Sequence, residues 1–166
     1  GLSQIHYRQG ELAEAQAVAQ LGLRMAQAQD DQRNLAYALQ TLGMIAWKQD
    51  DYAQAMRCYT ESLDLWQASK NPAGLAGIHN NLGLLFQRLG NLAQAIDHLQ
   101  QAQALFEQVG NLHGLACVYD NLGQAYMQSG DETSAMTALE QAVSILMQIG
   151  LDESQVFTGM WQAGTW

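Results

Sequence analysis

Small and apolar positions recur along this 166-residue chain with a period of 40 residues. Each period holds a leucine-glycine pair, and an alanine follows 12 residues after the glycine. A period of this length has room for two helices joined by a tight turn, which we expect over residues 72–89 and 92–109 in the third copy. The pattern predicts an all-α chain of helix pairs, marked by Leu42-Gly43 with Ala55, Leu82-Gly83 with Ala95, and Leu122-Gly123 with Ala135.

Polar residues mark where the expected helices begin. Asn71 is followed by Pro72, and proline is favoured in the first turn of a helix. Asp51 and Asn91 each precede a glutamine by three residues, which is the spacing of a capping box. We therefore expect the side chains of Asp51 and Asn91 to cap the second helix of their repeats.

Glycines mark where helices end. Gly110 and Gly150 stand at the ends of second helices, where a left-handed backbone conformation is needed. One period before the first complete copy, Gly10-Glu11 falls in the same register as Asp50-Asp51. We therefore expect an opening helix to end at Gly10 and the first copy to lack the front half of that helix.

The glycine of each leucine-glycine pair lies inside a helix, where it costs roughly 1 kcal/mol relative to alanine. Close packing explains this choice. Without a Cβ atom at Gly43, Gly83 and Gly123, and with only a methyl group on each facing alanine, two helix axes can approach toward the short end of the usual 8–10 Å range. One helix pair cannot bury both of its apolar faces, so stacked copies are expected to share a continuous core.

These features resemble the tetratricopeptide repeat. The leucine-glycine pair, the aromatic residue three positions later (Phe86, Tyr126) and the alanine of the second helix all match, although Ala46 departs from the pattern. The period of 40 in place of 34 is similar to the subclass in kinesin light chains, Pins-type adaptors and bacterial regulators. The resemblance implies a right-handed superhelical solenoid over residues 1–150, with a partial repeat at 1–30, full repeats at 31–70, 71–110 and 111–150, and a C-terminal capping helix or tail at 151–166.

The resemblance also implies a binding surface for a protein or peptide. In the family, the first helices of the repeats line a concave face, and the residue before the leucine-glycine pair points into it. Carboxamide side chains there offer both a donor and an acceptor to a peptide backbone. Neighbours at helical spacing extend the candidate site to Tyr37, Gln40, Thr41, Met44, Lys48, Asn80, Asn81, Leu84, Arg88, Asp120, Asn121, Gln124 and Gln128, with Gly77 and Cys117 beside them.

An alternative role stays open for Asn81 and Asn121. Polar side chains between helices are usually satisfied within the protein, so both residues could bond a neighbouring helix instead of a ligand. One family ligand is disfavoured. Co-chaperones of the family hold the C-terminal carboxylate of Hsp70 or Hsp90 with lysine and arginine, and the matching positions of this chain lack every one of those cations.

Charge narrows the class of partner. The formal net charge is −9, and a strongly acidic chain is poorly suited to the phosphate backbone of nucleic acid. The seven basic residues all lie between Arg8 and Arg88, whereas eight acidic residues follow Leu89. The second half therefore favours a net basic ligand, or it is simply a solvated acidic surface.

No catalytic or cofactor motif is present in the sequence. The four histidines, His6, His79, His98 and His113, are scattered along the chain, and we interpret His98 and His113 as lacking a cysteine or carboxylate at metal-ligand spacing. His79 occupies the phase of Leu39 and Tyr119, so we interpret it as a packed residue. We expect no enzyme activity, no cofactor and no metal.

The remaining expectations concern location and association. No apolar run approaches the roughly 18 residues of a membrane span, and two lone cysteines suit a reducing compartment, so a cytoplasmic protein is expected. The tail could cover the last helix pair, and the truncated N-terminal or the C-terminal hairpin could form a homo-oligomer. Two functions stay open: a protein-binding scaffold, or a regulatory or self-association segment of a larger bacterial signalling or transcription protein.

Overall fold

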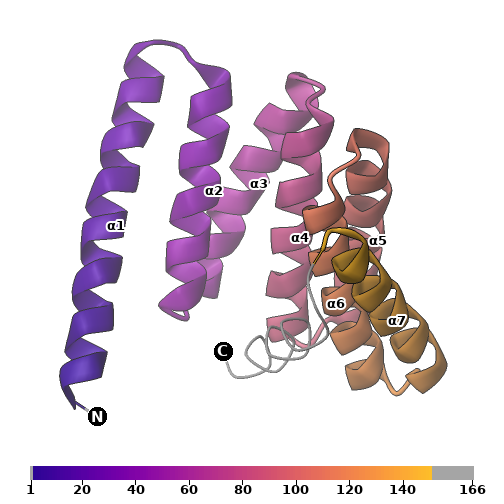
Figure 1. Cartoon of the computed structure of the whole chain (residues 1–166). Helices are drawn as coiled ribbons and strands as arrows, with labels where there is room; N and C mark the ends of the chain where they lie inside the picture. The colour runs from indigo at the N-terminus through magenta and orange to yellow at the C-terminus, as the bar shows by residue number, and fades with distance from the viewer. Residues whose placement is uncertain (1, 151–166) are drawn as a thin grey trace. The chain divides into compact units, whose positions relative to one another are not determined.

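The computed structural model describes the backbone of residues 2–150 and the side chains of residues 12–150. This part of the chain forms seven α-helices and no strand, which confirms the all-α prediction (Figure 1). The helices are α1 (Leu2–Ala28), α2 (Gln32–Lys48), α3 (Tyr52–Ala68), α4 (Pro72–Arg88), α5 (Leu92–Val109), α6 (Leu112–Ser129) and α7 (Glu132–Gln148). They group into two compact units, one with α1 to α3 and one with α4 to α7.

Each turn between helices has the same construction. One residue takes a left-handed conformation, and an aspartate or asparagine follows it. At Gly110 the φ angle is 69°, whereas at Lys70 a residue with a side chain takes a φ of 50°. The next residue then caps the following helix, as where Asp51 accepts a hydrogen bond from the backbone N–H of Gln54 at 3.0 Å. The caps predicted at Asp51 and Asn91 are confirmed, and the left-handed residues predicted at Gly110 and Gly150 are also found.

The turn at Lys70 gives a stability prediction. A residue with a Cβ atom is strained at positive φ, and glycine is not. We expect Lys70→Gly to raise the free energy of unfolding by about 0.5–1 kcal/mol, and Gly110→Ala to lower it by a similar amount. Urea denaturation followed by circular dichroism checks both changes. Equal and small effects of the two substitutions would show that the left-handed conformation does not limit stability.

The first copy of the repeat differs from the prediction. Helix α1 runs through Gly10-Glu11 without a break, although the register placed the end of a helix there. Elsewhere the residue after the left-handed position is aspartate or asparagine, whose short side chain reaches the N–H three residues on. Glu11 is not a favoured cap, and the helix-forming run Leu12-Ala13-Glu14-Ala15 follows it. Nothing at this point therefore begins a new helix.

In the first unit, α2 and α3 pack through one glycine and two aromatic rings. A Cβ atom built on Gly43 would collide with the ring of Tyr59, which is 2% exposed. The hydroxyl of the buried Ser62 donates a hydrogen bond to the backbone carbonyl of Ala36 at 2.9 Å. The ring of Trp66, which is fully buried, meets Tyr37 edge to face with centroids 4.7 Å apart.

In the second unit, the same contact occurs twice. A Cβ atom on Gly83 would lie 2.6 Å from Cγ of Leu99. A Cβ atom on Gly123 would lie 2.7 Å from Cγ of Leu139. The predicted close approach is therefore confirmed, but the atoms nearest to the glycines belong to the leucines. Ala95 contributes its backbone oxygen, 3.2 Å from the same point on Gly83.

Candidate functional site

The predicted site residues of the second unit lie on α4 and α6, two helices that contact each other. At their contact, Nδ2 of Asn121 donates a hydrogen bond to Oδ1 of Asn80 at 2.9 Å. Both asparagines are half-buried. The sequence left open that Asn121 bonds a neighbouring helix instead of a ligand. In the described residues, Asn121 does bond the neighbouring helix α4. Asn80 and Asn121 together fix how the first helices of two successive repeats lie against each other.

Asn81 is in a different state from Asn121. Asn81 as a whole is half-buried. Its amide Nδ2, however, is not exposed to solvent and has no hydrogen-bond partner among the described residues. A buried N–H without an acceptor costs about 1–3 kcal/mol.

A carboxylate, that of Asp120, precedes Asn121 on α6. Oδ2 of Asp120 accepts a hydrogen bond from Nε2 of Gln124 at 2.9 Å, and both residues are half-buried on α6. Burial raises the pKa of Asp120, and the Gln124 hydrogen bond opposes this change only in part. A half-buried carboxylate that pays a desolvation penalty is stabilised by a cation, so this position favours a basic group on a ligand.

The other predicted residues of this unit extend the same helices. Leu84 is half-buried on α4, and Arg88 is exposed at its last turn. Gln128 is exposed on the last turn of α6. Gly77 is half-buried and Cys117 is exposed. The second unit therefore carries eight of the 13 predicted residues on two adjacent helices: Asn80, Asn81, Leu84, Arg88, Asp120, Asn121, Gln124 and Gln128.

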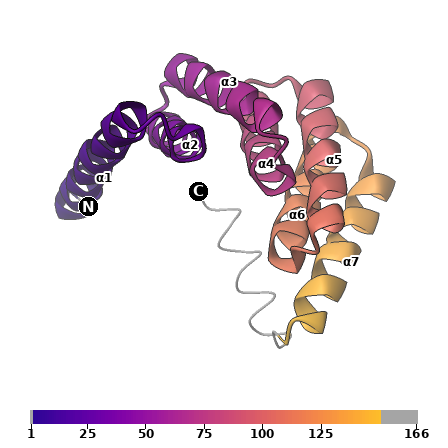
Figure 2. The ribbon, with the colours of Figure 1, turned by 90° about the horizontal axis from the view of Figure 1, so that it is seen from above.

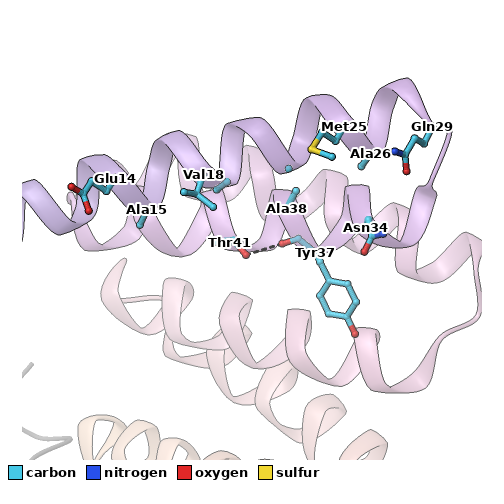
Figure 3. Close-up of a pocket in the computed structure, with 12 residues that line it drawn as sticks. Glu14, Ala15, Val18, Met25, Ala26, Gln29, Asn34, Tyr37, Ala38 and Thr41 are labelled. Carbon is cyan, nitrogen blue, oxygen red and sulfur yellow. Dashed lines mark hydrogen bonds between the residues drawn. The ribbon is translucent and has the colours of Figure 1, made fainter.

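The five predicted residues of the first unit all lie on α2: Tyr37, Gln40, Thr41, Met44 and Lys48. Two of them border a groove of about 830 Å³ between α1 and α2, which is lined mainly by small and apolar side chains (Figure 3). There the hydroxyl of Thr41 donates to the backbone carbonyl of Tyr37 at 2.9 Å. The ring of Tyr37 points away from α1 and packs on Trp66 of α3 (Figure 3). Thr41 is thus occupied within its own helix.

A histidine pair was not predicted from the sequence. Nδ1 of the buried His79 on α4 lies 2.9 Å from Nδ1 of His98 on α5. The ring of His98 stacks on Phe86 with centroids 5.3 Å apart. Burial, reinforced by the neighbouring His98, lowers the pKa of His79 to about 4, and burial also lowers the pKa of His98. The interpretation of His79 as a packed residue agrees with this contact.

The described residues form no three-ligand metal cluster and no membrane-spanning helix. Among the side chains of residues 12–150, no three histidine, cysteine, aspartate or glutamate residues gather where they could hold a metal ion. In the described part of the chain, every helix is too short or too polar to cross a bilayer.

The model of the tetratricopeptide repeat matches residues 1–68 and 74–148, which together make up most of the chain. The chain belongs to the tetratricopeptide repeat family. This membership assigns the helix pairs seen here to a family of protein-binding scaffolds that are typically non-catalytic. A search of curated proteins gave no match.

Three solved structures share the tetratricopeptide fold with this chain. BtubC (BKLC) from P. vanneervenii aligns with a TM-score of 0.75 at 22% identity over 91% of this chain, which spans 63% of the length of BtubC. A putative kinesin light chain with nearly identical repeats from Podospora anserina gives 0.68 at 17% identity, over 99% of this chain and 84% of that one. The N-terminal domain of stress-induced protein-1 from C. elegans gives 0.61 at 17% identity, over 80% of this chain and 96% of that one. At these identities, the likeness concerns the fold.

Proposed function

We propose that this chain is a non-catalytic scaffold that binds a segment of another protein along α4 and α6. The observation that carries the proposal is the amide of Asn81, whose Nδ2 is buried without a hydrogen-bond partner among the described residues. Asn81 follows Asn80 on α4, and Asn80 accepts the hydrogen bond of Asn121 at the contact of two first helices. An acceptor on a peptide backbone would satisfy this donor.

We further propose that the bound segment is net basic. Between Pro72 and Gly150 the sequence has six acidic residues and one basic residue, Arg88. Asp120 adds a half-buried carboxylate at the site itself, with its pKa raised by burial. A lysine or arginine on the ligand would stabilise the ionised form of this carboxylate.

A cytoplasmic setting fits this role. Cys58 and Cys117 are both free thiols, as expected in a reducing compartment. The alternative function, a regulatory or self-association segment of a larger bacterial signalling or transcription protein, stays a prediction from the sequence.

A selection from a library of random 12-residue peptides tests the proposal. We expect peptides that bind the wild-type chain to carry a net positive charge. Asn81→Ala should weaken the binding of such a peptide about 5–10-fold, and Asp120→Asn should weaken it by a similar factor, as the loss of one hydrogen bond or one charge partner predicts. Fluorescence polarisation with a labelled peptide measures both constants.

Glu140→Gln is the matched control for Asp120→Asn. It removes the same charge from the exposed face of α7, away from α4 and α6. We expect this variant to bind the peptide as the wild type does. Melting curves of all variants should coincide within a few degrees. Selected peptides that are neutral or acidic, or that respond equally to Glu140→Gln, would argue against this binding site.

A further inference from the structure

Two histidine rings of the third repeat meet where α4 packs against α5. These helices follow each other in the chain, are joined by the short turn at residues 89–91, and lie side by side in the second unit (Figures 1 and 2). Nδ1 of His79 on α4 lies 2.9 Å from Nδ1 of His98 on α5. Imidazole nitrogens are the commonest metal ligands in proteins, so the two helices place two potential ligand atoms together.

The distance between the two nitrogens matches one edge of a metal coordination shell. Imidazole nitrogen binds Zn²⁺ at about 2.0–2.1 Å, and two ligands at this distance and at a right angle around one ion are about 2.9 Å apart. Right angles between neighbouring ligands occur in the square-planar shells of ions such as Ni²⁺ and Cu²⁺. The observed separation of the His79 and His98 nitrogens is therefore the one that a chelated ion of this class requires.

Metal binding needs a lone pair on each Nδ1. A neutral histidine can carry its hydrogen on Nε2, and its Nδ1 then has a free lone pair. With both rings in this form, a rotation of each ring about its Cβ–Cγ bond directs the two lone pairs toward one ion. The ion takes the place of the hydrogen that His79 and His98 share in the structure, and water fills its remaining positions.

The packing around the rings holds them in place and leaves them within reach of solvent. Phe86 follows His79 by seven residues, which places both on one face of α4. The ring of His98 stacks on Phe86 with centroids 5.3 Å apart. His79 is only 7% exposed, whereas His98 is half-buried, so an ion can approach from the side of His98. Rings that are held by packing before the ion binds lose little freedom on binding.

The charges near the pair favour a cation. Asp97 precedes His98 on α5, and its exposed carboxylate acts electrostatically on both rings. Arg88 is the only lysine or arginine between residues 72 and 150, and it follows His79 by nine residues, which is about 13 Å along a helix. A divalent ion between the two nitrogens is therefore attracted by the nearest carboxylate and is far along α4 from the cation.

We propose that His79 and His98 form a binding site for one divalent late transition-metal ion, of the class of Ni²⁺, Cu²⁺ and Zn²⁺, between α4 and α5. The site has two protein ligands, so it agrees with the lack of a three-ligand cluster among the described side chains. It departs from the expectation of no metal, which considered ligand spacing along the chain, because these ligands are 19 residues apart on two helices. The proposal does not depend on peptide binding along α4 and α6.

Isothermal titration calorimetry of the tag-free chain with Ni²⁺ tests the site. We expect one Ni²⁺ to bind per chain at neutral pH, and we expect no binding of Mg²⁺, which prefers oxygen ligands. His98→Ala installs the residue found in register at Ala138, and it should weaken Ni²⁺ binding at least tenfold, because one of two ligands is lost. His79→Leu should have the same effect. His113→Gln removes an exposed histidine of α6 and should bind Ni²⁺ as the wild type does.

Two measurements on the wild type keep the test valid if a variant fails to fold. Zn²⁺ should change the nitrogen chemical shifts of Nδ1 in His79 and His98 together and leave the ring of His113 unchanged. Ni²⁺ at a hundredfold excess over its dissociation constant should raise the melting temperature by about 5–10 °C, because the ion binds the folded state.

Three results would overturn the proposal. The first is a wild-type chain that binds no Ni²⁺. The second is Ni²⁺ binding that His79→Leu and His98→Ala leave unchanged. The third is an equal loss of affinity in His113→Gln, or a Zn²⁺-dependent shift confined to His113, since either would assign the bound ion to exposed histidines.

Discussion

Gly83→Ala is expected to lower the free energy of unfolding of the unit formed by α4 to α7 by about 1–3 kcal/mol. The added methyl group would lie 2.6 Å from Cγ of Leu99 and 3.2 Å from the backbone oxygen of Ala95. Leu99 is fully buried, so its side chain has little room to move. The overlap therefore outweighs the roughly 1 kcal/mol that alanine gains over glycine in a helix interior.

The matched control for this change is Gly22→Ala in α1. It introduces the same methyl group into a helix, but nothing lies within 4 Å of the new atom. We expect this variant to be more stable than the wild type by about 0.5–1 kcal/mol. Urea denaturation of both variants measures the two effects. If both substitutions changed the free energy of unfolding in the same direction, close approach of the helices would not explain why glycine occupies position 83.

The histidine pair makes the second unit sensitive to acid. When both imidazoles are neutral, Nδ1–H of one ring can donate a hydrogen bond to the unprotonated Nδ1 of the other. Two protonated rings would instead place two N–H donors against each other at 2.9 Å. Burial lowers the pKa of His79 to about 4, below its ordinary value of 6.5. The neutral form is therefore favoured by folding. This contribution to stability is complete above pH 6.5 and is lost as the pH falls toward 4.

We expect the free energy of unfolding to fall by about 1–2 kcal/mol between pH 7.5 and pH 5, after allowance for the half-exposed His98. His79→Leu, which installs the residue found in register at Leu39, should remove most of this dependence. His113→Gln, which alters an exposed histidine of α6, should retain it. Urea denaturation of the wild type, His79→Leu and His113→Gln at matched pH values measures this pH dependence. An unchanged pH dependence in His79→Leu would assign the acid sensitivity to other groups.

Features that repeat in the sequence could be predicted, because each depends on a few neighbouring residues. The cap at Asp51 and the left-handed turn at Gly110 follow from local backbone chemistry. The contact of Gly83 with α5 follows from one glycine in three registered copies. The continuous α1 was not predicted, because the register at Gly10 suggested a turn while the residues after it favour helix.

Side-chain contacts between two helices could not be predicted from the sequence. His79 and His98 are 19 residues apart on two helices, and neither position has a histidine in the other copies. The bond between Asn121 and Asn80 joins residues 41 apart, and the register pointed to Asn81 in place of Asn80. Such contacts depend on how two helices are rotated about their axes. The repeat pattern gives this rotation only to within a neighbouring residue.

The site was predicted on the concave face formed by the first helices, and its residues belong to two compact units. The residues on α4 and α6 share one compact unit, in which a hydrogen bond joins the two helices. Those on α2 belong to the other unit, where Tyr37 and Thr41 border a groove with α1. The sequence pattern could not show this division, because the leucine-glycine pairs recur with one unbroken period.

Chemical-shift mapping of a selected basic peptide on the labelled chain tests the proposed binding site most directly. We predict that the largest changes fall on the backbone of α4 and α6 and on the side-chain amides of Asn81, Asn121 and Gln124, with a downfield shift of the Asn81 amide as it gains an acceptor. Changes confined to α5 and α7, with the Asn81 amide unmoved, would contradict the account.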